Sequence, residues 1–358
     1  MKEILLEHFH RYPQMQLQDA VKLLYQSEFG GGHMITSPEK SLKSLEDEWK
    51  GCKGRKPPVV CESIGGGMHR IYIDALNEGL SPDTLNRLFV ETANGKGGTR
   101  EAFEKKLTLL VQCCEQGELP YEKAQAEEYL DLYRSRGCPP VSHSACYCEA
   151  YHPAYRVVAD CYARYYEAFV KIDQALAEKE MLLISIDGMC AAGKSTMGRI
   201  LQSVYSCNLF HMDDFFLQPH QRTPKRMNQV GSNVDYERFK EEILDHLGDR
   251  EGLEYQVYDC KTQTLDHFVK TSWNRLNIVE GSYSQHPYFG DIWDLRFFCE
   301  VSPAKQLNRI LARNGESMLK RFKQEWIPKE NDYFAAFGIR EKSIRMENNA
   351  EKYVDRLK

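Results

Sequence analysis

A glycine-rich segment in the middle of the chain, residues 188–196, constrains the fold more than any other feature of the sequence. It reads Gly-Met-Cys-Ala-Ala-Gly-Lys-Ser-Thr and directly follows the apolar run Met181-Leu-Leu-Ile-Ser-Ile-Asp187. Such a run predicts a buried strand, and the pattern G-x-x-x-x-G-K-S predicts a tight loop that opens into a helix. The sequence therefore predicts a strand, a loop and a helix in direct succession, with the loop shaped to hold a polyphosphate.

The residue types in this loop suit a nucleotide. Its glycines permit backbone conformations that side chains block, so that successive N–H groups converge on phosphate oxygens. Lys194 adds an exposed, mobile positive charge for the β- and γ-phosphates, and the Ser195 hydroxyl is placed to ligate Mg²⁺. We therefore expect ATP and Mg²⁺ as cofactors, although a glycine-rich turn that binds no ligand is the alternative. The residues expected around the nucleotide are Gly188, Ala191, Ala192, Gly193, Lys194, Ser195 and Thr196.

Length and composition favour an intracellular enzyme with more than one domain. The 358 residues exceed what one core usually serves, and the net charge of −5 gives no reason to expect nucleic acid or a membrane surface as a partner. The apolar runs are too short to span a bilayer, and the N-terminus does not resemble a secretory signal. The 12 cysteines are scattered, so we expect reduced thiols and a cytoplasmic location. The sequence leaves a homo-oligomer open.

We expect two domains that meet near residue 180. Apolar residues recur at three- and four-residue spacing from Val158 to Leu176, which predicts one connecting helix over 154–179. Residues 1–153 are predicted to form a mostly helical domain of unknown role. Its clearest helical patterns are 15–28 and 82–93.

The segment 180–358 is predicted to be an α/β domain with a doubly wound parallel sheet, because strand-like and helical segments alternate along it. The expected strands are 181–187, 207–212, 254–259, 276–280 and 295–301. The expected helices are 194–205, 235–247 and 303–313.

Carboxylates follow two of these strands. Asp213 and Asp214 come after the second strand, and Glu280 ends the apolar run Leu276-Asn-Ile-Val-Glu280. Ligands of an open α/β sheet bind beyond the carboxyl ends of its strands, so these acids would face the phosphates. An acid there can deprotonate an attacking hydroxyl or hold Mg²⁺ through water. The alternative for Asp213 and Asp214 is helix capping.

With these motifs in this order, residues 181–358 resemble the uridine kinase family of P-loop kinases, which includes nicotinamide riboside kinase and is related to phosphoribulokinase. The resemblance implies a P-loop NTPase fold and transfer of the ATP γ-phosphate to a hydroxyl of a small molecule, commonly the 5′-hydroxyl of a riboside. It also implies that Asp213 is the general base. Ser195, Glu280 and Asp213 are then the residues that serve Mg²⁺.

The resemblance also implies which residues bind the substrate. Asp235 matches the family acid that accepts hydrogen bonds from ribose hydroxyls, with helix capping as the alternative, and Asp214 and Tyr258 are expected nearby. Uridine kinases read the base with an aromatic residue and a histidine, where this chain has Cys260 and Gln263. Both exchanges remove groups that hold a pyrimidine, so we do not expect selectivity for uridine or cytidine.

Two basic segments are candidates for contacts with phosphate. Arg309 and Arg313, four residues apart on a predicted helix that ends at Asn-Gly, are expected to lie on one face and to stabilise the transferring phosphate together. Solvated surface charge is the alternative. The segment 221–226 can contact a substrate phosphate or form a mobile loop, and we favour the loop. Residues 326–334 place aromatics and acids where they match no family pattern.

The first 150 residues match no family pattern. Glycine clusters occur at 30–32, 65–67 and 94–98, each followed by or containing a basic residue or a histidine, so they indicate either helix-ending turns, which we favour, or a second anion site. Four soft ligands lie close together in sequence, but their spacing is not that of a standard zinc knuckle, and we favour free cysteines. They are Cys138, His143, Cys146 and Cys148.

Two classes of function follow. The first is a small-molecule kinase, which we favour because Asp213, Glu280 and the paired arginines supply a base, a metal site and charge stabilisation. The second is a nucleotide-dependent regulator whose P-loop domain senses ATP and whose N-terminal domain carries the output. The partners expected for the kinase are ATP and a small hydroxyl-bearing substrate.

Overall fold

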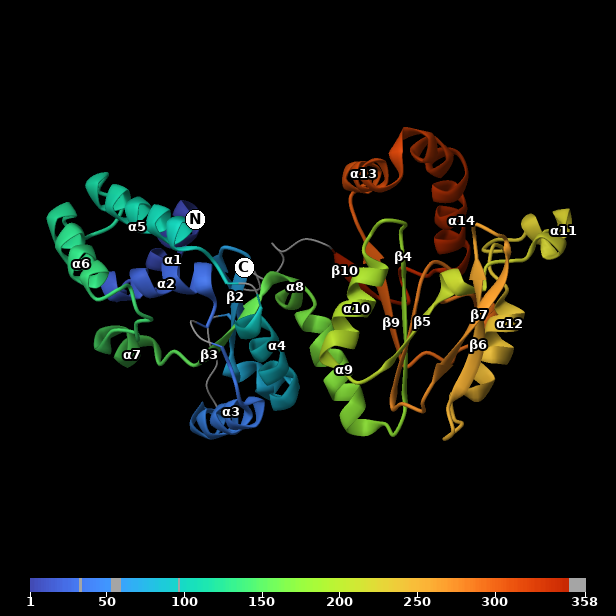
Figure 1. Ribbon diagram of the computed structural model, residues 1–358, viewed down its shortest axis with the longest axis horizontal. Coiled ribbons are helices and arrows are strands. Elements are labelled where there is room, and N and C mark those ends of the chain that lie inside the picture. The colour runs from blue at the N-terminus through green and yellow to red at the C-terminus, as the bar shows by residue number, and fades with distance from the viewer. Residues whose placement is uncertain (32–33, 53–58, 96, 348–358) are drawn as a thin grey trace. The chain divides into compact units, whose positions relative to one another are not determined.

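The computed structural model describes residues 1–31, 34–52, 59–95 and 97–347 (Figure 1). They form two compact units, one with the described residues from Met1 to Asp173 and the other with those from Gln174 to Glu347. The division falls within α9 (Tyr166–Glu178), a little before the predicted boundary. In the described ranges, no helix combines the length and the apolar character needed to cross a membrane.

The first unit is mostly helical and also contains a small antiparallel sheet. The strands β1 (Cys61–Gly65), β2 (Met68–Tyr72) and β3 (Tyr155–Ala159) pair in the order β1-β2-β3. Helix α5 packs against α2 and α6 (Figure 1). The helices are α1 (Lys2–Arg11), α2 (Leu17–Phe29), α3 (Pro38–Cys52), α4 (Pro82–Asn94), α5 (Arg100–Glu115), α6 (Lys123–Ser135), α7 (Ala145–Tyr151) and α8 (Asp160–Ala163), with a 3-10 helix η1 (Ile73–Glu78).

The predicted helix over 154–179 is wrong in its first part. Residues 155–159 form β3, and the helical part of the predicted range consists of the short α8 and of α9. Val157 and Val158 are buried and β-branched, which suits a strand that pairs with β2. The periodicity alone did not reveal this strand, because its partner β2 lies far away in sequence.

The second unit is built on a parallel five-stranded sheet in the order β10-β9-β4-β8-β5. Every residue of β4 (Leu182–Gly188) is buried, as expected for a central strand of a parallel sheet. From β4 the chain runs to β5 at one edge of the sheet and then returns to β8, which lies beside β4. It next crosses to β9 on the other side of β4 and continues to β10 at the opposite edge. The other strands are β5 (Asn208–His211), β8 (Leu276–Glu280), β9 (Leu295–Glu300) and β10 (Ile344–Glu347).

Four of the five predicted strands belong to this sheet, and the fifth does not. The segment predicted at 254–259 forms β6 (Leu253–Asp259), which pairs only with β7 (Thr264–Thr271) in an antiparallel hairpin. The last strand, β10, is a short segment that the sequence analysis missed.

The helices of the second unit begin close to their predicted positions. Helix α10 (Lys194–Val204) contacts β4, β5 and β8, and α12 (Tyr236–Glu242) is shorter than predicted. Helix α13 (Pro303–Arg321) is broken at Gly315, where φ is 77°. A π-helical segment (Phe322–Trp326) and α14 (Ile327–Phe337) follow.

Candidate active site

The glycine-rich loop joins β4 to α10 as predicted from the sequence. At Gly188 φ is 134°, and a Cβ there would lie 2.1 Å from the carbonyl oxygen of Cys299 on β9, so only glycine fits. Gly193 caps α10 in the left-handed conformation with a φ of 106°. The first N–H groups of a helix lack intrahelical acceptors, so the loop and the start of α10 expose donors suited to an anion.

The Lys194 side chain forms hydrogen bonds with the backbone of the loop that precedes it. Its Nζ donates hydrogen bonds to the carbonyl oxygens of Gly188 at 2.8 Å and Met189 at 3.1 Å. The side chain is half-buried, not exposed as predicted. Burial lowers the pKa of Lys194, but nearby carboxylates, with that of Glu330 first, outweigh this effect and raise the pKa above its ordinary value. The ammonium charge is therefore fixed at the loop.

Glu280 lies beside the loop because of the strand register. It pairs with Ile186 of β4 and with His211 of β5, so three neighbouring strands end at one place. The Glu280 side chain is buried, and its Oε1 lies 2.6 Å from Nδ1 of His211. This hydrogen bond raises the pKa of His211 against the effect of burial. His211 was not identified from the sequence, although it lies two residues before Asp213.

Asp213 and Asp214 sit in a short 3-10 helix (Met212–Phe215) after β5 and have different surroundings. Asp213 is exposed, and no described residue makes a hydrogen bond or ion pair with its carboxylate. Partial removal from water, together with the charge of Glu280, raises the pKa of Asp213, while Lys194 lowers it. Asp214 instead accepts a long hydrogen bond of 3.5 Å from the Tyr255 hydroxyl. Asp213 is thus the carboxylate left free to accept a proton.

The two predicted arginines are not equivalent. Arg309 donates a hydrogen bond of 3.1 Å to the carbonyl oxygen of Ala191 in the loop. Arg313 is exposed and bonds to the side chain of its neighbour Asn314 at 2.8 Å. The structure therefore brings Arg309 alone to the loop.

Residues from α14, which the sequence did not identify, brace the loop and its strand. Glu330 is buried and accepts hydrogen bonds from the backbone N–H of Cys190 at 2.9 Å and from the Ser282 hydroxyl at 2.7 Å. Tyr333 donates a hydrogen bond of 2.8 Å to Asp187, the acidic residue of β4. The acids and aromatics of 326–334, which matched no family pattern, were the available signal.

The predicted substrate residues make contacts within the protein. Asp235 caps α12 by accepting from the backbone N–H of Arg238 at 3.1 Å, and it also accepts from the Gln221 amide at 2.6 Å. The capping alternative is therefore present in the structure. The Tyr258 hydroxyl accepts a hydrogen bond of 2.6 Å from Arg222.

The segment 221–226, favoured as a mobile loop, makes specific contacts. Arg222 donates two hydrogen bonds to the carbonyl oxygen of Leu217, and Arg226 pairs with Glu237 at 2.7 Å. Two short helical turns, Pro219–Gln221 and Pro224–Met227, include parts of this segment.

The residues present fit a nucleotide with Mg²⁺. Ser195 and Thr196 are exposed on the first turn of α10, and Ser195, Asp213 and Glu280 offer the oxygen donors that Mg²⁺ prefers. Among the described residues, no three His, Cys, Asp or Glu side chains are arranged to hold a metal by themselves. An ion at this site would therefore take phosphate and water oxygens as further ligands, as Mg²⁺ commonly does.

The candidate zinc ligands of the first unit do not converge. His143 Nδ1 lies 2.8 Å from Asp19, and its Nε2 lies 2.6 Å from the Tyr155 hydroxyl. Cys138 is half-buried with a free thiol, and Cys146 and Cys148 are exposed and free.

The glycine clusters mostly end elements. Gly30 ends α2, Gly95 ends α4, and residues 65–67 connect β1 to β2. His33 and Lys96 of these clusters lie outside the described residues.

Comparison with known proteins gives limited matches. No family model matches this chain, and no curated protein matches it. Similar solved structures include one titled a possible uridine kinase from Bacillus stearothermophilus, with 21% identity, 46% of this chain and 96% of that chain covered, and a TM-score of 0.32. The YGR205w protein has 13% identity, 51% and 92% coverage and a TM-score of 0.34. TT1252 from Thermus thermophilus has 15% identity, 49% and 92% coverage and a TM-score of 0.26.

The solved structure titled a possible uridine kinase is similar over about half of the chain, and the N-terminal half is not matched. Identity and TM-score are low in each case. The function of this chain is therefore inferred from the geometry of its own residues.

Proposed function

We propose that the second unit is an ATP-dependent phosphotransferase of the P-loop NTPase type, with a doubly wound sheet, that phosphorylates a hydroxyl group of a small molecule. The observation that carries this proposal is the meeting of Lys194, Glu280 and the free carboxylate of Asp213 at the carboxyl ends of adjacent strands. A loop that only bound nucleotide would not need an unpaired carboxylate beside it.

Each residue has a distinct role in the proposed reaction. Mg·ATP supplies the phosphoryl group and shields its negative charge. Asp213 accepts the proton of the acceptor hydroxyl as the acceptor oxygen bonds to the γ-phosphorus and the bond to the bridging oxygen of ADP breaks. Lys194 and Arg309 would stabilise negative charge on the phosphates, and Glu280 and Ser195 would hold a bound Mg²⁺, which would shield further charge.

The acceptor is proposed as a small alcohol, with ribosides as one class and without selectivity for pyrimidines. Cys260 and Gln263 lie at the turn of the β6–β7 hairpin, and Gln263 has a left-handed φ of 60° and lies 3.4 Å from Arg222. Neither side chain offers the aromatic face or the imidazole that would recognise a pyrimidine in the related kinases.

The test is a screen of purified full-length protein with Mg·ATP against uridine, cytidine, nicotinamide riboside, simple sugars and vitamin alcohols. ADP release and the mass of the product are measured, with Asp213→Asn as the matched control. A phosphorylated product that disappears in Asp213→Asn supports the proposal. ATP binding without transfer to any acceptor would instead favour the nucleotide-dependent regulator.

A further inference from the structure

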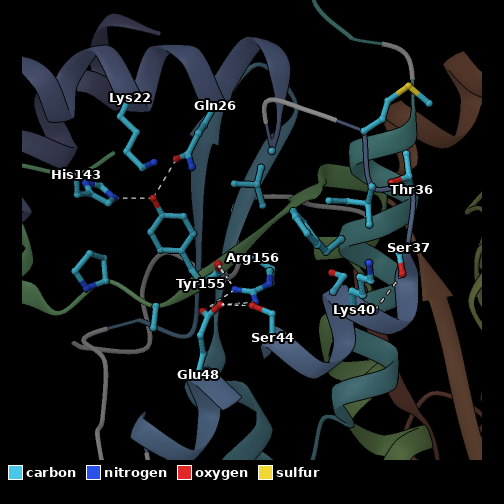
Figure 2. Close-up of a pocket in the computed structure, with 18 residues that line it drawn as sticks. Lys22, Gln26, Thr36, Ser37, Lys40, Ser44, Glu48, His143, Tyr155 and Arg156 are labelled. Carbon is cyan, nitrogen blue, oxygen red and sulfur yellow. Dashed lines mark hydrogen bonds and ion pairs between the residues drawn. The ribbon is translucent and has the colours of Figure 1, made fainter. Parts of the chain in front are cut away.

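A pocket of about 620 Å³ lies in the first unit, and its size is typical of small-molecule sites. Side chains of α2, α3 and β3 and the segments that precede β3 line it. Figure 2 shows Lys22, Gln26, His143 and Tyr155 gathered at one end and Thr36, Ser37 and Lys40 at the other. None of these residues belongs to the site proposed for phosphoryl transfer.

Positively charged side chains outnumber negatively charged ones among the described residues that line this pocket. Among the described residues that line it, Glu48 is the only carboxylate, and both of its oxygens accept hydrogen bonds from Arg156, at 2.9 and 3.0 Å. In the part of the chain that the structure describes, no carboxylate lies within ion-pair distance of the Lys22 or Lys40 ammonium groups. The first turn of α3, which carries Lys40, adds the positive end of a helix dipole.

Lys22 and Gln26 offer hydrogen-bond donors at one end of the pocket. The Lys22 ammonium donates one bond, of 2.8 Å, to the carbonyl oxygen of Val141, which leaves further N–H groups. Gln26 is only 9% exposed, and its oxygen accepts two hydrogen bonds from Arg70, at 2.8 and 3.1 Å. This fixes the amide orientation and leaves its NH₂ group without an acceptor among the described residues.

Hydrogen bonds among His143, Asp19 and Tyr155 support this end. Burial lowers the pKa of His143 to about 4, so the ring is neutral at physiological pH. Its Nδ1–H then donates to Asp19, and Nε2 accepts from the Tyr155 hydroxyl. Asp19 also accepts from the backbone N–H and hydroxyl of Ser144 at 2.9 and 2.6 Å, so hydrogen bonds already occupy its oxygens. Among the described residues, the carboxylate of Asp19 is thus engaged by His143 and Ser144 rather than by Lys22 or Gln26.

We propose that this pocket is a binding site for a small organic anion, whose acidic group pairs with Lys22 and the amide NH₂ of Gln26. The remainder of the ligand extends toward α3, where Lys40 supplies a second positive charge. Phe89, Ile35 and Val157 line the same pocket and would cover an apolar part of the ligand.

Isothermal titration calorimetry of the full-length protein tests this proposal, with Mg²⁺ and a non-hydrolysable ATP analogue present to occupy the phosphate loop. The probes are phenyl phosphate and benzoate as anions and phenol as the neutral compound of the same shape. We expect at least one anion to bind and phenol to bind far more weakly. Binding of the phosphate but not the carboxylate, or the reverse, then identifies the acidic group.

Variants locate the site. Lys22→Met is expected to weaken anion binding by about tenfold or more, as for loss of a charge-assisted hydrogen bond. Lys40→Met, at an exposed position that tolerates the change, is expected to weaken it severalfold, and Lys43→Met, exposed on the same helix outside the pocket, to leave it unchanged. The proposal is overturned if neither anion binds, if phenol binds equally well, or if Lys22→Met and Lys40→Met both bind like the wild type.

Discussion

Glu330 Oε2 accepts a hydrogen bond of 2.9 Å from the backbone N–H of Cys190, which ties α14 to the phosphate loop. The other oxygen of the same carboxylate holds the Ser282 hydroxyl, so Glu330 bridges two segments that follow strands of the sheet. Its negative charge also attracts Lys194. Glu330 therefore shapes the loop and competes with a nucleotide for the lysine.

Variants of Glu330 separate these two effects. Glu330→Ala leaves the Cys190 N–H buried without a partner, so we expect the unfolding free energy to fall by about 1–3 kcal/mol. Glu330→Gln keeps an oxygen for that N–H but removes the charge, so we expect near-normal stability and severalfold tighter ATP binding. Chemical denaturation and ATP titration measure the two quantities, with the exposed Glu316→Gln as control. Weaker ATP binding in Glu330→Gln would show that the charge does not compete for Lys194.

Asp213→Asn is expected to reduce kcat by ~100-fold or more with little change in ATP affinity, because it keeps the shape of the side chain and loses the base. Asp214→Asn is the matched control and should cost much less. If Asp214→Asn proves to be the worse variant, the base is the neighbouring residue.

The pH profile gives a second test of Asp213. A base works only when deprotonated, so kcat/KM should fall as the pH falls through the pKa of this carboxyl. Because that pKa is raised, the acidic limb should lie above the ordinary aspartate value of about 3.9. We expect this limb to be absent from the residual activity of Asp213→Asn. An unchanged limb in the variant would assign it to another group.

Arg309 and Arg313 are expected to differ although the sequence pairs them. Arg309→Met removes the arginine that contacts the loop and should lower kcat by roughly 100-fold, the effect of losing one positioned donor to a transition-state charge. Arg313→Met should stay close to the wild type. Steady-state kinetics of the two variants decide the matter, and equal losses would mean that both arginines reach the phosphates during the reaction.

Asp187 should make stability depend on pH. It is fully buried, and burial raises its pKa to about 6 despite hydrogen bonds from Tyr333 and the Gly188 and Gln285 backbones. The folded chain therefore holds this proton more tightly than the unfolded chain, and the unfolding free energy falls as the pH rises from about 4 through about 6.

Asp187→Asn should remove about 3 kcal/mol of this pH-dependent change, a shift of about two pKa units. Urea titrations of wild type and variant at several pH values measure it, and the exposed Asp332→Asn should retain the wild-type dependence. The same pH dependence in Asp187→Asn would contradict the raised pKa.

The parts of the fold predicted from the sequence are those with strong local signals. The glycine pattern and the apolar runs placed β4, α10, β8 and β9 to within a residue or two. The strand β3 was mistaken for helix because its partner β2 is distant in sequence, and β6 was assigned to the wrong sheet because a strand-like pattern does not specify its neighbours.

The residues of the site also divide into those that local sequence signals predict and those that depend on tertiary contacts. Lys194, Asp213 and Glu280 were predicted because they follow strands of a recognisable order, whereas His211 and Glu330 act through contacts that only the tertiary structure creates. Arg313 was grouped with Arg309 by helical spacing, but in the structure only Arg309 bonds to the loop, whereas the exposed Arg313 bonds to Asn314.

The most direct test of the proposed kinase is Lys194→Ala, compared with the wild type in one preparation for ATP affinity, turnover with the accepted substrate and thermal unfolding. Lys194 contributes the fixed ammonium of the loop, so we expect much weaker Mg·ATP binding and nearly abolished turnover, with the cooperative unfolding transition retained. Unchanged ATP affinity and turnover in this variant would contradict the assignment of the loop as the phosphate-binding site.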